Sequence, residues 1–418
     1  MEKKLINYLM SLMIIATTFG QEVDQIKLAN EYYQSKEYDK AVDIYKKLSK
    51  QKRNIPQIHS NYLDLMINND KPDDAYKYIN YVIKQYPGNS RYRVDQIYVA
   101  RLLPNQKEYK RLKDALYDAS RGNVNTLKKI AEELSQRQLH NDALVFLSHA
   151  RVESQDSKAY ALDFAKNYSS LGNDPKMIAE YVNFASQQTR HIPYIKNILQ
   201  ELLSKESIKK ILEEVLIIRS QQYPDDVLYN DFLMWLYIQK NDYYGAFVQA
   251  KAIDRNSQRS GNTVMQVAKV AYDNQAYGDA MLFYDYIVTK SDQGSMREKA
   301  QFLSLLSKEK KLTEKLPIDK QALYQIAGAY QQFYDYTTET NPYRLQALKN
   351  KAGIMAYQLN ELDTAVNILE KLKNLPGITK TLEAQVKMDL GNINLIVGNH
   401  WEASLLYSQI EKDNPYAA

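Results

Sequence analysis

The sequence contains no cysteine, and this absence removes several kinds of function at once. Without a thiol the chain cannot form disulfides, bind a metal through thiolates, use a cysteine nucleophile or carry a lipid on an N-terminal cysteine. Glycine and proline are also few, at 13 and 11 of 418 residues. Because runs rich in Val, Ile and Thr are scarce as well, the composition predicts an all-α protein of long helices joined by short turns.

An excess of charge of one sign is missing too. The 55 basic and 50 acidic residues are spread along the whole chain and leave a formal net charge of +5. A dedicated nucleic-acid binder concentrates its basic residues on one face or in one segment. We therefore expect no nucleic-acid partner.

Motifs for catalysis and metal binding are absent from the sequence. The five histidines include no H-E-x-x-H motif and no pair four residues apart, so we expect no metal. The sequence also lacks glycine-rich phosphate loops and the G-x-S-x-G motif of many hydrolases. We therefore expect no cofactor and no catalytic residues, and we predict that the protein is not an enzyme.

The N-terminus has the pattern of a secretory signal. Lys3 and Lys4 precede an apolar stretch at residues 5–19, and the small residues Thr18 and Gly20 stand before Gln21. This order predicts a signal peptide at residues 1–20, cleaved near Gly20/Gln21, and a periplasmic or secreted mature protein. No later segment approaches the roughly 20 apolar residues of a membrane span, so we expect no transmembrane segment after cleavage.

Small residues recur at a spacing typical of helical repeats. Ala41 and Ala75 are 34 residues apart, as are Ala246 and Ala280, and the 68 residues from Ala75 to Ala143 are twice that spacing. Met177 stands 34 residues after Ala143, and Ala365 and Ala403 occupy similar surroundings. We call these eight residues the anchors; the offsets of the flanking residues are shown by Ala29, Tyr32, Tyr38, Tyr45 and Leu48 around Ala41.

These offsets have a simple structural meaning. Apolar residues three, four and seven positions apart share one face of a helix. A small anchor lets two antiparallel helices approach closely, an aromatic residue four positions later fills the groove between them, and prolines such as Pro87 end the second helix. One such pair cannot bury its apolar face alone, so neighbouring pairs stack.

The pattern resembles the tetratricopeptide repeat, most closely in EYYQSKEYDKAVDIYKKL and NQAYGDAMLFYDYIV. The resemblance implies a right-handed α-solenoid of antiparallel helix pairs. The repeat's usual tryptophan is missing, and His59 takes its place in one unit. His59, His140 and His400 all occupy aromatic positions, and we predict that they pack. The last unit, GNHWEASLLYSQIEKDNP, is similar to repeats in exported proteins of Bacteroidota.

The repeats divide the chain into segments. Helix 402–412 carries apolar residues to the last turn, so the final unit looks uncapped, and we expect an end-to-end contact at residues 402–418 or a continuation of the chain. The predicted segments are a signal peptide (1–20), N-terminal repeats (21–88), a degenerate helix pair (89–123), repeats (124–191), a second degenerate pair (192–226), repeats (227–295), an irregular helical insert (296–345) and C-terminal repeats (346–418).

The resemblance also indicates where a partner binds, because the first helix of each tetratricopeptide pair lines a concave groove. Aromatic and Met side chains in such grooves are typical binding anchors, although the same residues can simply pack between repeats. Amides such as Asn30 and Asn392 share these positions. The candidate partner-binding residues are Tyr33, Trp235, Ile238, Met265, Tyr272, Tyr357 and Met388.

The leading functional hypothesis is a non-catalytic scaffold that binds a protein or peptide in the cell envelope. The resemblance suggests secretion, motility or outer-membrane assembly machinery as its setting. The alternative is a glycan or peptidoglycan binder that uses some of the 35 tyrosines, since tyrosine offers flat, amphipathic contacts. A subunit of an enzyme whose catalytic part lies elsewhere is a third hypothesis.

Overall fold

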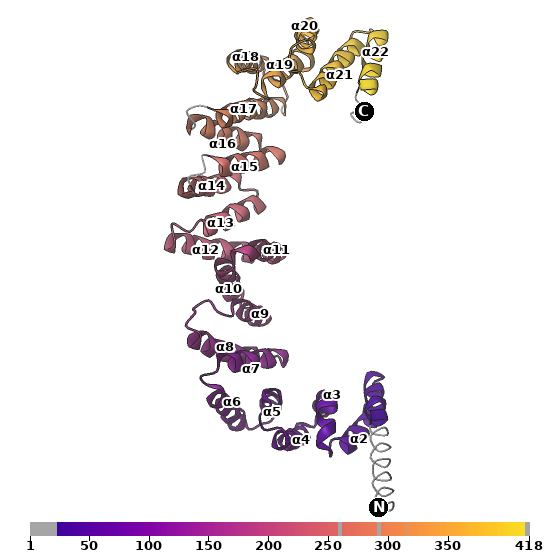
Figure 1. The fold of residues 1–418 in the computed structure, drawn as a ribbon, viewed down its shortest axis with the longest axis vertical. Helices are drawn as coiled ribbons and strands as arrows, with labels where there is room; N and C mark the ends of the chain where they lie inside the picture. Colours follow the sequence, from indigo (N-terminus) through magenta and orange to yellow (C-terminus); the bar gives the residue numbers. More distant parts are fainter. Residues whose placement is uncertain (1–22, 258–260, 291–293, 315, 414–418) are drawn as a thin grey trace, which may run out of the picture. The chain divides into compact units, whose positions relative to one another are not determined.

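The computed structural model of the chain is all-α, which confirms the predicted fold class. It describes residues 23–257, 261–290, 294–314 and 316–413. In these residues the helices follow one another as antiparallel pairs (Figure 1). The same residues include no helix with the length and apolarity required to cross a bilayer. The predicted signal peptide and its cleavage site lie outside the described residues, and the right-handed superhelix stays a prediction.

The chain forms two compact units, residues 1–212 and 213–418, whose boundary falls inside α12. Short 3-10 turns, η1 (Lys52–Asn54) and η2 (Thr189–His191), precede the third and the eleventh helix. The pairs of the first unit are a helix at residues 23–34 with α2 (Tyr38–Leu48), α3 (Ile55–Asn68) with α4 (Pro72–Gln85), α5 (Ser90–Leu102) with α6 (Gln106–Ser120), α7 (Val124–Gln136) with α8 (His140–Glu153), α9 (Ala161–Ser170) with α10 (Asp174–Gln187), and α11 (Ile192–Leu202) with α12 (Glu206–Gln222).

The second unit continues the same arrangement. One of its first helices, α19, ends in a π-helical turn, η3, and such turns occur frequently at functional sites. The pairs are α13 (Val227–Gln239) with α14 (Tyr243–Ser257), α15 (Asn262–Asp273) with α16 (Tyr277–Lys290), α17 (Ser295–Thr313) with α18 (Lys320–Tyr336), α19 (Arg344–Gly353) and η3 (Ile354–Gln358) with α20 (Leu362–Lys373), and α21 (Lys380–Ile396) with α22 (His400–Asp413).

The anchors take the positions that their spacing predicts. Each is the fourth residue of the second helix of a pair, from Ala41 in α2 to Ala403 in α22. All seven alanines are fully buried, and Met177 is 2% exposed. The aromatic residue four positions after the anchor is buried as well at Tyr45 and Tyr284. The repeat pattern therefore marks the line along which the two helices of a pair touch.

The turn before each anchored helix has one fixed backbone feature. The residue five positions before the anchor lies in the left-handed region, with φ between 55° and 85°. Only two of these residues are glycine, the residue type that adopts this conformation without strain. They are Lys36, Asp70, Gln138, Gly172, Asn241, Gln275, Asn360 and Gly398.

Helix pairs also fill the segments in which the sequence motif is weak. The pairs α5–α6, α11–α12 and α17–α18 occupy them, and α17 is 19 residues long. The turns before their second helices have no left-handed residue at the corresponding positions, 104, 204 and 318. These pairs therefore keep the stacking of the repeat but not its turn.

Each unit has its core between successive pairs. In the first unit, one cluster extends from Ile26 to Val99 and a second from Val94 to Phe164. In the second unit, one cluster surrounds Phe247 and Phe283, whose rings stack at 4.3 Å, and another extends from Phe302 to Leu406. The pairs that contribute to these clusters thus bury their apolar stripes against their neighbours, as expected of a repeat array.

Candidate binding sites on the first helices

A polar hollow of about 230 Å³ lies on the first helices of three successive pairs in the first unit. Ser60 and Asp64 come from α3, Arg91, Val94 and Asp95 come from α5, and Glu133, Gln136 and Arg137 come from α7 and its C-terminal residue. We call this the α5 hollow. Asn89 caps the N-terminus of α5 by accepting a hydrogen bond from the backbone N–H of Arg91, which fixes the start of the helix.

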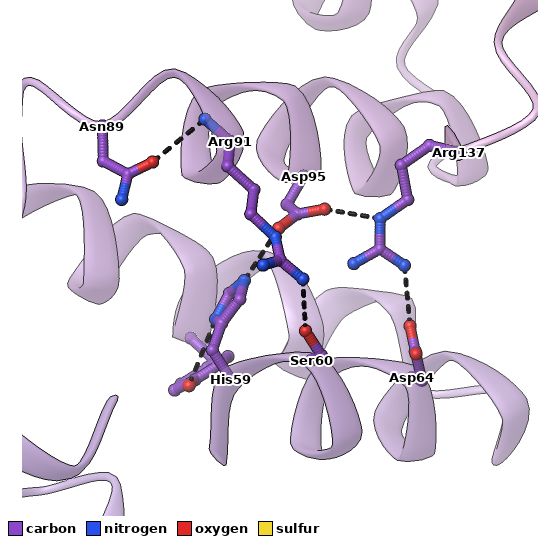
Figure 2. A network of polar contacts seen from close by, with 8 residues as sticks. His59, Ser60, Asp64, Asn89, Arg91, Asp95 and Arg137 are labelled. Atoms are coloured by element: carbon purple, nitrogen blue, oxygen red, sulfur yellow. Dashed lines mark hydrogen bonds and ion pairs between the residues drawn. The ribbon is translucent and has the colours of Figure 1, made fainter. Parts of the chain in front are cut away.

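A chain of hydrogen bonds joins His59 to three residues that line this hollow, Asp95, Arg137 and Asp64 (Figure 2). Asp95 is 1% exposed; one of its oxygens bonds His59 Nε2 at 2.9 Å and the other accepts from Arg137 Nε at 2.5 Å. The same guanidinium donates through Nη1 to Asp64 at 2.8 Å. Burial by itself raises the pKa of Asp95, but the hydrogen bond from His59 and the charge of Arg137 lower it further than burial raises it. The carboxylate is therefore held ionised and ties three helices together.

His59 stands next to a carboxylate, as the histidine of a catalytic dyad does, but its geometry is structural. The residue is 2% exposed, and both ring nitrogens are engaged. Nδ1 faces the hydroxyl of Tyr78 at 3.3 Å, and Nε2 faces Asp95. A general base needs a nitrogen within reach of the proton that it removes, and neither nitrogen of His59 is available. The predicted packing role of His59 is thus confirmed, with a buried polar link added to it.

The other two histidines at aromatic positions differ from His59. His140 is half-buried and bonds Asn167 through Nδ1 at 2.9 Å. His400 is exposed, so the prediction that it packs is wrong. The reason is that the buried stripe of α22 begins one turn later, at Ala403.

Arg91 and Glu133 are the two charged residues of the α5 hollow that stand outside this chain of hydrogen bonds. Arg91 is exposed and donates to Ser60 Oγ at 2.6 Å. Glu133 accepts from Ser90 through Oε1 at 3.1 Å, while its Oε2 is buried without a hydrogen-bond partner. Burial raises the pKa of Glu133. In the described part of the chain neither residue forms an ion pair, so both can still engage a ligand.

A second hollow, of about 240 Å³, lies on the other side of α7 and shares Gln136 with the first. We call it the α9 hollow. Glu132 and Ser135 line it from α7, and Asp163, Lys166 and Asn167 line it from α9. Burial is the main cause of a raised pKa at Asp163. No ion pair joins this carboxylate to another group among the residues that the structure describes.

One of the residues predicted from sequence, Met388, lines a hollow of about 260 Å³ in the second unit, and a second, Tyr357, bonds one of the lining residues. We call it the α21 hollow. Met388 lines it from α21, together with Lys349 of α19, Asp389 of α21 and Ile410 of α22. Tyr357, from the π-helical turn η3, donates to Asp389 Oδ1 at 3.2 Å. Burial, followed by the charge of Asp389, raises the pKa of Tyr357 to about 12.

None of the remaining predicted residues lines one of these three hollows. Met265 is 9% exposed and belongs to the core, and Ile238 and Tyr272 are partly buried against the same cluster. Trp235 packs edge-on against Phe232 of its own helix. Tyr33 is half-buried beside Tyr38, with ring centroids 6.0 Å apart.

Two amides predicted to line the groove are engaged within their own helix pair. Asn30 accepts from the hydroxyl of Tyr45 at 2.6 Å, and Asn392 accepts from that of Tyr407 at 2.8 Å. In both cases the amide stands 11 residues before an anchor and the tyrosine stands four after it. These amides therefore join the two helices of a pair and are only partly free to meet a ligand.

The polar hollows were missed from sequence, although part of the signal was present. Ser60 and Asp64 stand 15 and 11 residues before Ala75, which are groove positions of the repeat. Only aromatic, Met and Ile residues were chosen at those positions. Arg91 belongs to a pair without a clear motif, so no anchor was available from which to count its position.

Across residues 23–413, outside the gaps noted above, no group of three His, Asp or Glu side chains is placed to hold a metal ion. The fold and these hollows together define a helical-repeat protein with hollows along its first helices.

Known proteins resemble this chain only weakly. No protein-family model and no curated protein sequence matches the chain. Among solved structures, a complex described as Naa15/Naa10 bound to HypK matches over 92% of this chain and 68% of its own (TM-score 0.31). Yeast Tom70 matches over 95% and 98% (TM-score 0.29), and a tetratricopeptide repeat protein from Parabacteroides merdae over 78% and 94% (TM-score 0.25). Identity is 11% in each case, so the likeness says nothing about partners.

Proposed function

We propose that this protein is a non-catalytic scaffold that binds a protein or peptide partner on the first helices of its pairs. The observation that carries the proposal is the α21 hollow. Met388 is 38% and Tyr357 44% exposed, and both residues stand at groove positions of the repeat. Exposed aromatic and Met side chains beside a hollow are typical binding anchors.

The chemistry around these anchors suits a peptide better than a reaction. Lys349 Nζ lies 3.4 Å from Asp389 Oδ2, and the hydroxyl of Tyr357 bonds the other oxygen. Asp389 is therefore held by an ion pair at one oxygen and by a hydrogen bond at the other, and Oδ2 itself has no hydrogen-bond partner. Apolar contact with Met388 and Ile410 is left for a partner side chain, for which burial contributes roughly 1.5–3 kcal/mol.

The direct test compares the wild-type chain with a Tyr357→Ala/Met388→Ala double variant as bait in an envelope extract of the source organism. A Tyr244→Ala variant is the matched control, because Tyr244 is 56% exposed but lies on α14, a second helix. We expect one protein to be captured by the wild type and by the control, and to be lost from a double variant that is still helical by circular dichroism. Equal capture by all three would refute the assignment of this surface.

The envelope location is part of the same proposal and rests on the N-terminal signal pattern alone. Cell fractionation and the N-terminal sequence of the isolated protein test it directly. We expect recovery from the envelope fraction with residues 1–20 removed. An intact Met1 on protein recovered from the cytosol would overturn this part.

A glycan-binding function receives less support from the structure. Exposed tyrosines lie on several different helices, for example Tyr194 on α11, Tyr244 on α14 and Tyr336 on α18. The same preparation should therefore stay in solution when it is mixed with insoluble cell wall. Depletion by cell wall, without specific capture of any protein, would favour the glycan binder.

A further inference from the structure

The near balance of charge over the whole chain conceals one uneven region in the first unit. Residues 46–54, around the connection from α2 to α3, include five basic residues and no acidic one. Residues 84–93, around the next connection between pairs, include three basic residues and again no acidic one. We call these eight residues the basic edge. They are Lys46, Lys47, Lys50, Lys52, Arg53, Lys84, Arg91 and Arg93.

The two connections of the basic edge lie side by side. Because successive helices are antiparallel, both connections are at the same end of the helices. The Tyr86 hydroxyl donates to the backbone carbonyl of Lys52 at 2.8 Å, and the Tyr81 hydroxyl donates to that of Lys50 at 3.2 Å. Lys52 Nζ lies 5.1 Å from the centroid of the Tyr86 ring. Basic residues from two separate parts of the sequence therefore form one surface.

The lysines of the basic edge are exposed and are not neutralised by carboxylates. In the described part of the chain, no ion pair includes Lys46, Lys47, Lys50, Lys52 or Lys84. The carboxylates set against them are Asp24 in the first helix, Asp43 one turn before Lys46, and Glu133 of α7, on which Lys129 and Arg91 act. The basic residues outnumber these carboxylates, so a surplus of positive charge remains at this end of the helices.

Helix stability explains only part of this surplus. Lys46, Lys47 and Lys84 stand in the last turns of α2 and α4, where the helix dipole favours cations. Lys52 precedes α3 and Arg91 lies in the first turn of α5, where the dipole favours anions instead. Positive charge is therefore present at positions where it works against the helices, and an anionic partner would account for it.

The opposite end of the same two pairs has the other sign. Residues 35–40 and 69–74, around the turns within the pairs, include five acidic and three basic residues. The first two pairs are thus positive at one end of their helices and negative at the other. A charged plane turns such a body so that its positive end faces the plane, because every basic group of that end can then approach it together.

Two observations favour a phospholipid surface over an acidic protein or a nucleic acid. The lysines of the edge are exposed on flexible stems without a fixed donor geometry, which suits mobile headgroup phosphates better than one defined ligand. The helix at residues 23–34 also begins at this end, since it is antiparallel to α2. The apolar residues 5–19, which the sequence predicts to enter a membrane during export, are therefore attached to the fold at the basic edge.

We propose that the basic edge binds the anionic headgroups of a phospholipid membrane. Lys46, Lys47, Lys50 and Lys52 provide the main contact, and Lys84 extends it along the next connection. Juxtamembrane lysines and arginines are attracted in this way to the phosphates of anionic lipids. The surface belongs to the first unit and its partner is not a protein, so its test is independent of the Tyr357 and Met388 test.

The experiment measures how much of the chain sediments with lipid vesicles. Residues 21–418 are used, because they include every residue that the structure describes and lack the apolar segment 5–19, which would enter a bilayer by itself. We expect binding to phosphatidylcholine vesicles that contain about 30% phosphatidylglycerol, and none to phosphatidylcholine alone. Raising NaCl from about 0.05 M to about 0.5 M should release the chain, since salt screens exposed charges. Equal binding to both vesicles, or binding to neither, would overturn the proposal.

Two variants with the same change of net charge locate the contact. The edge variant carries Lys46→Gln, Lys47→Gln, Lys50→Gln and Lys52→Gln. The control variant carries Lys36→Gln, Lys40→Gln, Lys71→Gln and Lys77→Gln, all exposed near the opposite end of the same pairs. One lysine near an anionic surface changes affinity by about fivefold, so the edge variant should bind at least about a hundredfold more weakly, while the control stays within about threefold. An equal loss in two variants that are both helical by circular dichroism would show that net charge alone matters, and would refute the assignment.

Soluble polyanions test the other partners. Poly-glutamate represents an acidic protein, and a duplex oligonucleotide represents a nucleic acid. We expect the chain to stay on the vesicles when either is added at the same concentration of negative charge as the lipid. Release by one of them, with tighter binding to it than to the vesicles, would identify that class as the partner and overturn the membrane proposal.

Discussion

Replacing Asp95 by Asn gives the sharpest test of the buried chain of hydrogen bonds. The carboxylate is 1% exposed and is shared between His59 of α3 and Arg137 at the end of α7. Asparagine has nearly the same volume but no charge, so it leaves the guanidinium, which is 19% exposed, with Asp64 as its only carboxylate. Breaking a buried ion pair on one side costs about 3–5 kcal/mol, and we expect a loss of about 3 kcal/mol because Asn can keep part of the hydrogen bonding.

The assay should detect a local loss, because the stability of a repeat array is a sum of neighbouring contacts. Hydrogen exchange should become faster in α3, α5 and α7, while α15 and α16 of the second unit keep their protection. Asp273→Asn is the control, since Asp273 is 52% exposed and its pair with Lys269 is a surface pair. Its expected cost is below about 1 kcal/mol. If both variants exchange alike, the network contributes no stability.

The pH dependence of stability is a second test of Asp95. The pKa of Asp95 is lower in the folded chain than its unfolded value of about 3.9. The stability that it contributes is therefore fully present above the unfolded value and is lost as the pH falls toward the folded value. The difference between wild type and Asp95→Asn should accordingly be constant near neutrality and should shrink below about pH 4.

Three further predictions follow from single features of the fold. Gln138→Gly should stabilise the α7–α8 pair by up to about 1 kcal/mol in urea unfolding, because glycine adopts the left-handed conformation of residue 138 without strain. Lys77→Gly, inside α4, is the control and should cost about 1 kcal/mol. A loss of stability in both variants would contradict this prediction. Gly391→Ala should cost about 1–3 kcal/mol and speed exchange in α22, since its Cβ would lie 2.6 Å from the Tyr407 ring; unchanged exchange would contradict this. Tyr357 should ionise near pH 12 in an ultraviolet titration of the wild type from which the titration of Tyr357→Phe is subtracted, whereas the same difference for the unfolded chains should show ionisation near pH 10. The free energy of unfolding should therefore fall as the pH rises from about 10 toward 12.

The sequence was sufficient to predict the helix pairs and the line of contact within them. The small residue at the fourth position of a second helix is a strong signal, because a small side chain lets the two helices of a pair approach closely. The seven alanine anchors are all fully buried. Where packing tolerates several residue types, as in α5–α6, no such signal exists. There the helices were located by length and composition alone.

Candidate binding residues were harder to predict than the helix pairs, for a physical reason. Groove positions face either a ligand or the neighbouring pair, and side-chain type does not separate the two. Met265 turns into the core, whereas Met388 lies at a hollow. The polar site depends on contacts between residues far apart in sequence, such as Arg137 with Asp64, and these contacts appear only when α3, α5 and α7 are stacked.

The left-handed turn has a consequence for how these repeats can vary. Its residue type ranges over Lys, Asp, Gln, Asn and Gly, so substitution there is tolerated. Its length is not free, because each residue added between the turn and the anchor rotates the second helix by about 100° and moves the anchor off the contact line. Insertions and deletions should therefore be excluded from this five-residue interval and should collect in the connections between pairs, which vary in length along the chain.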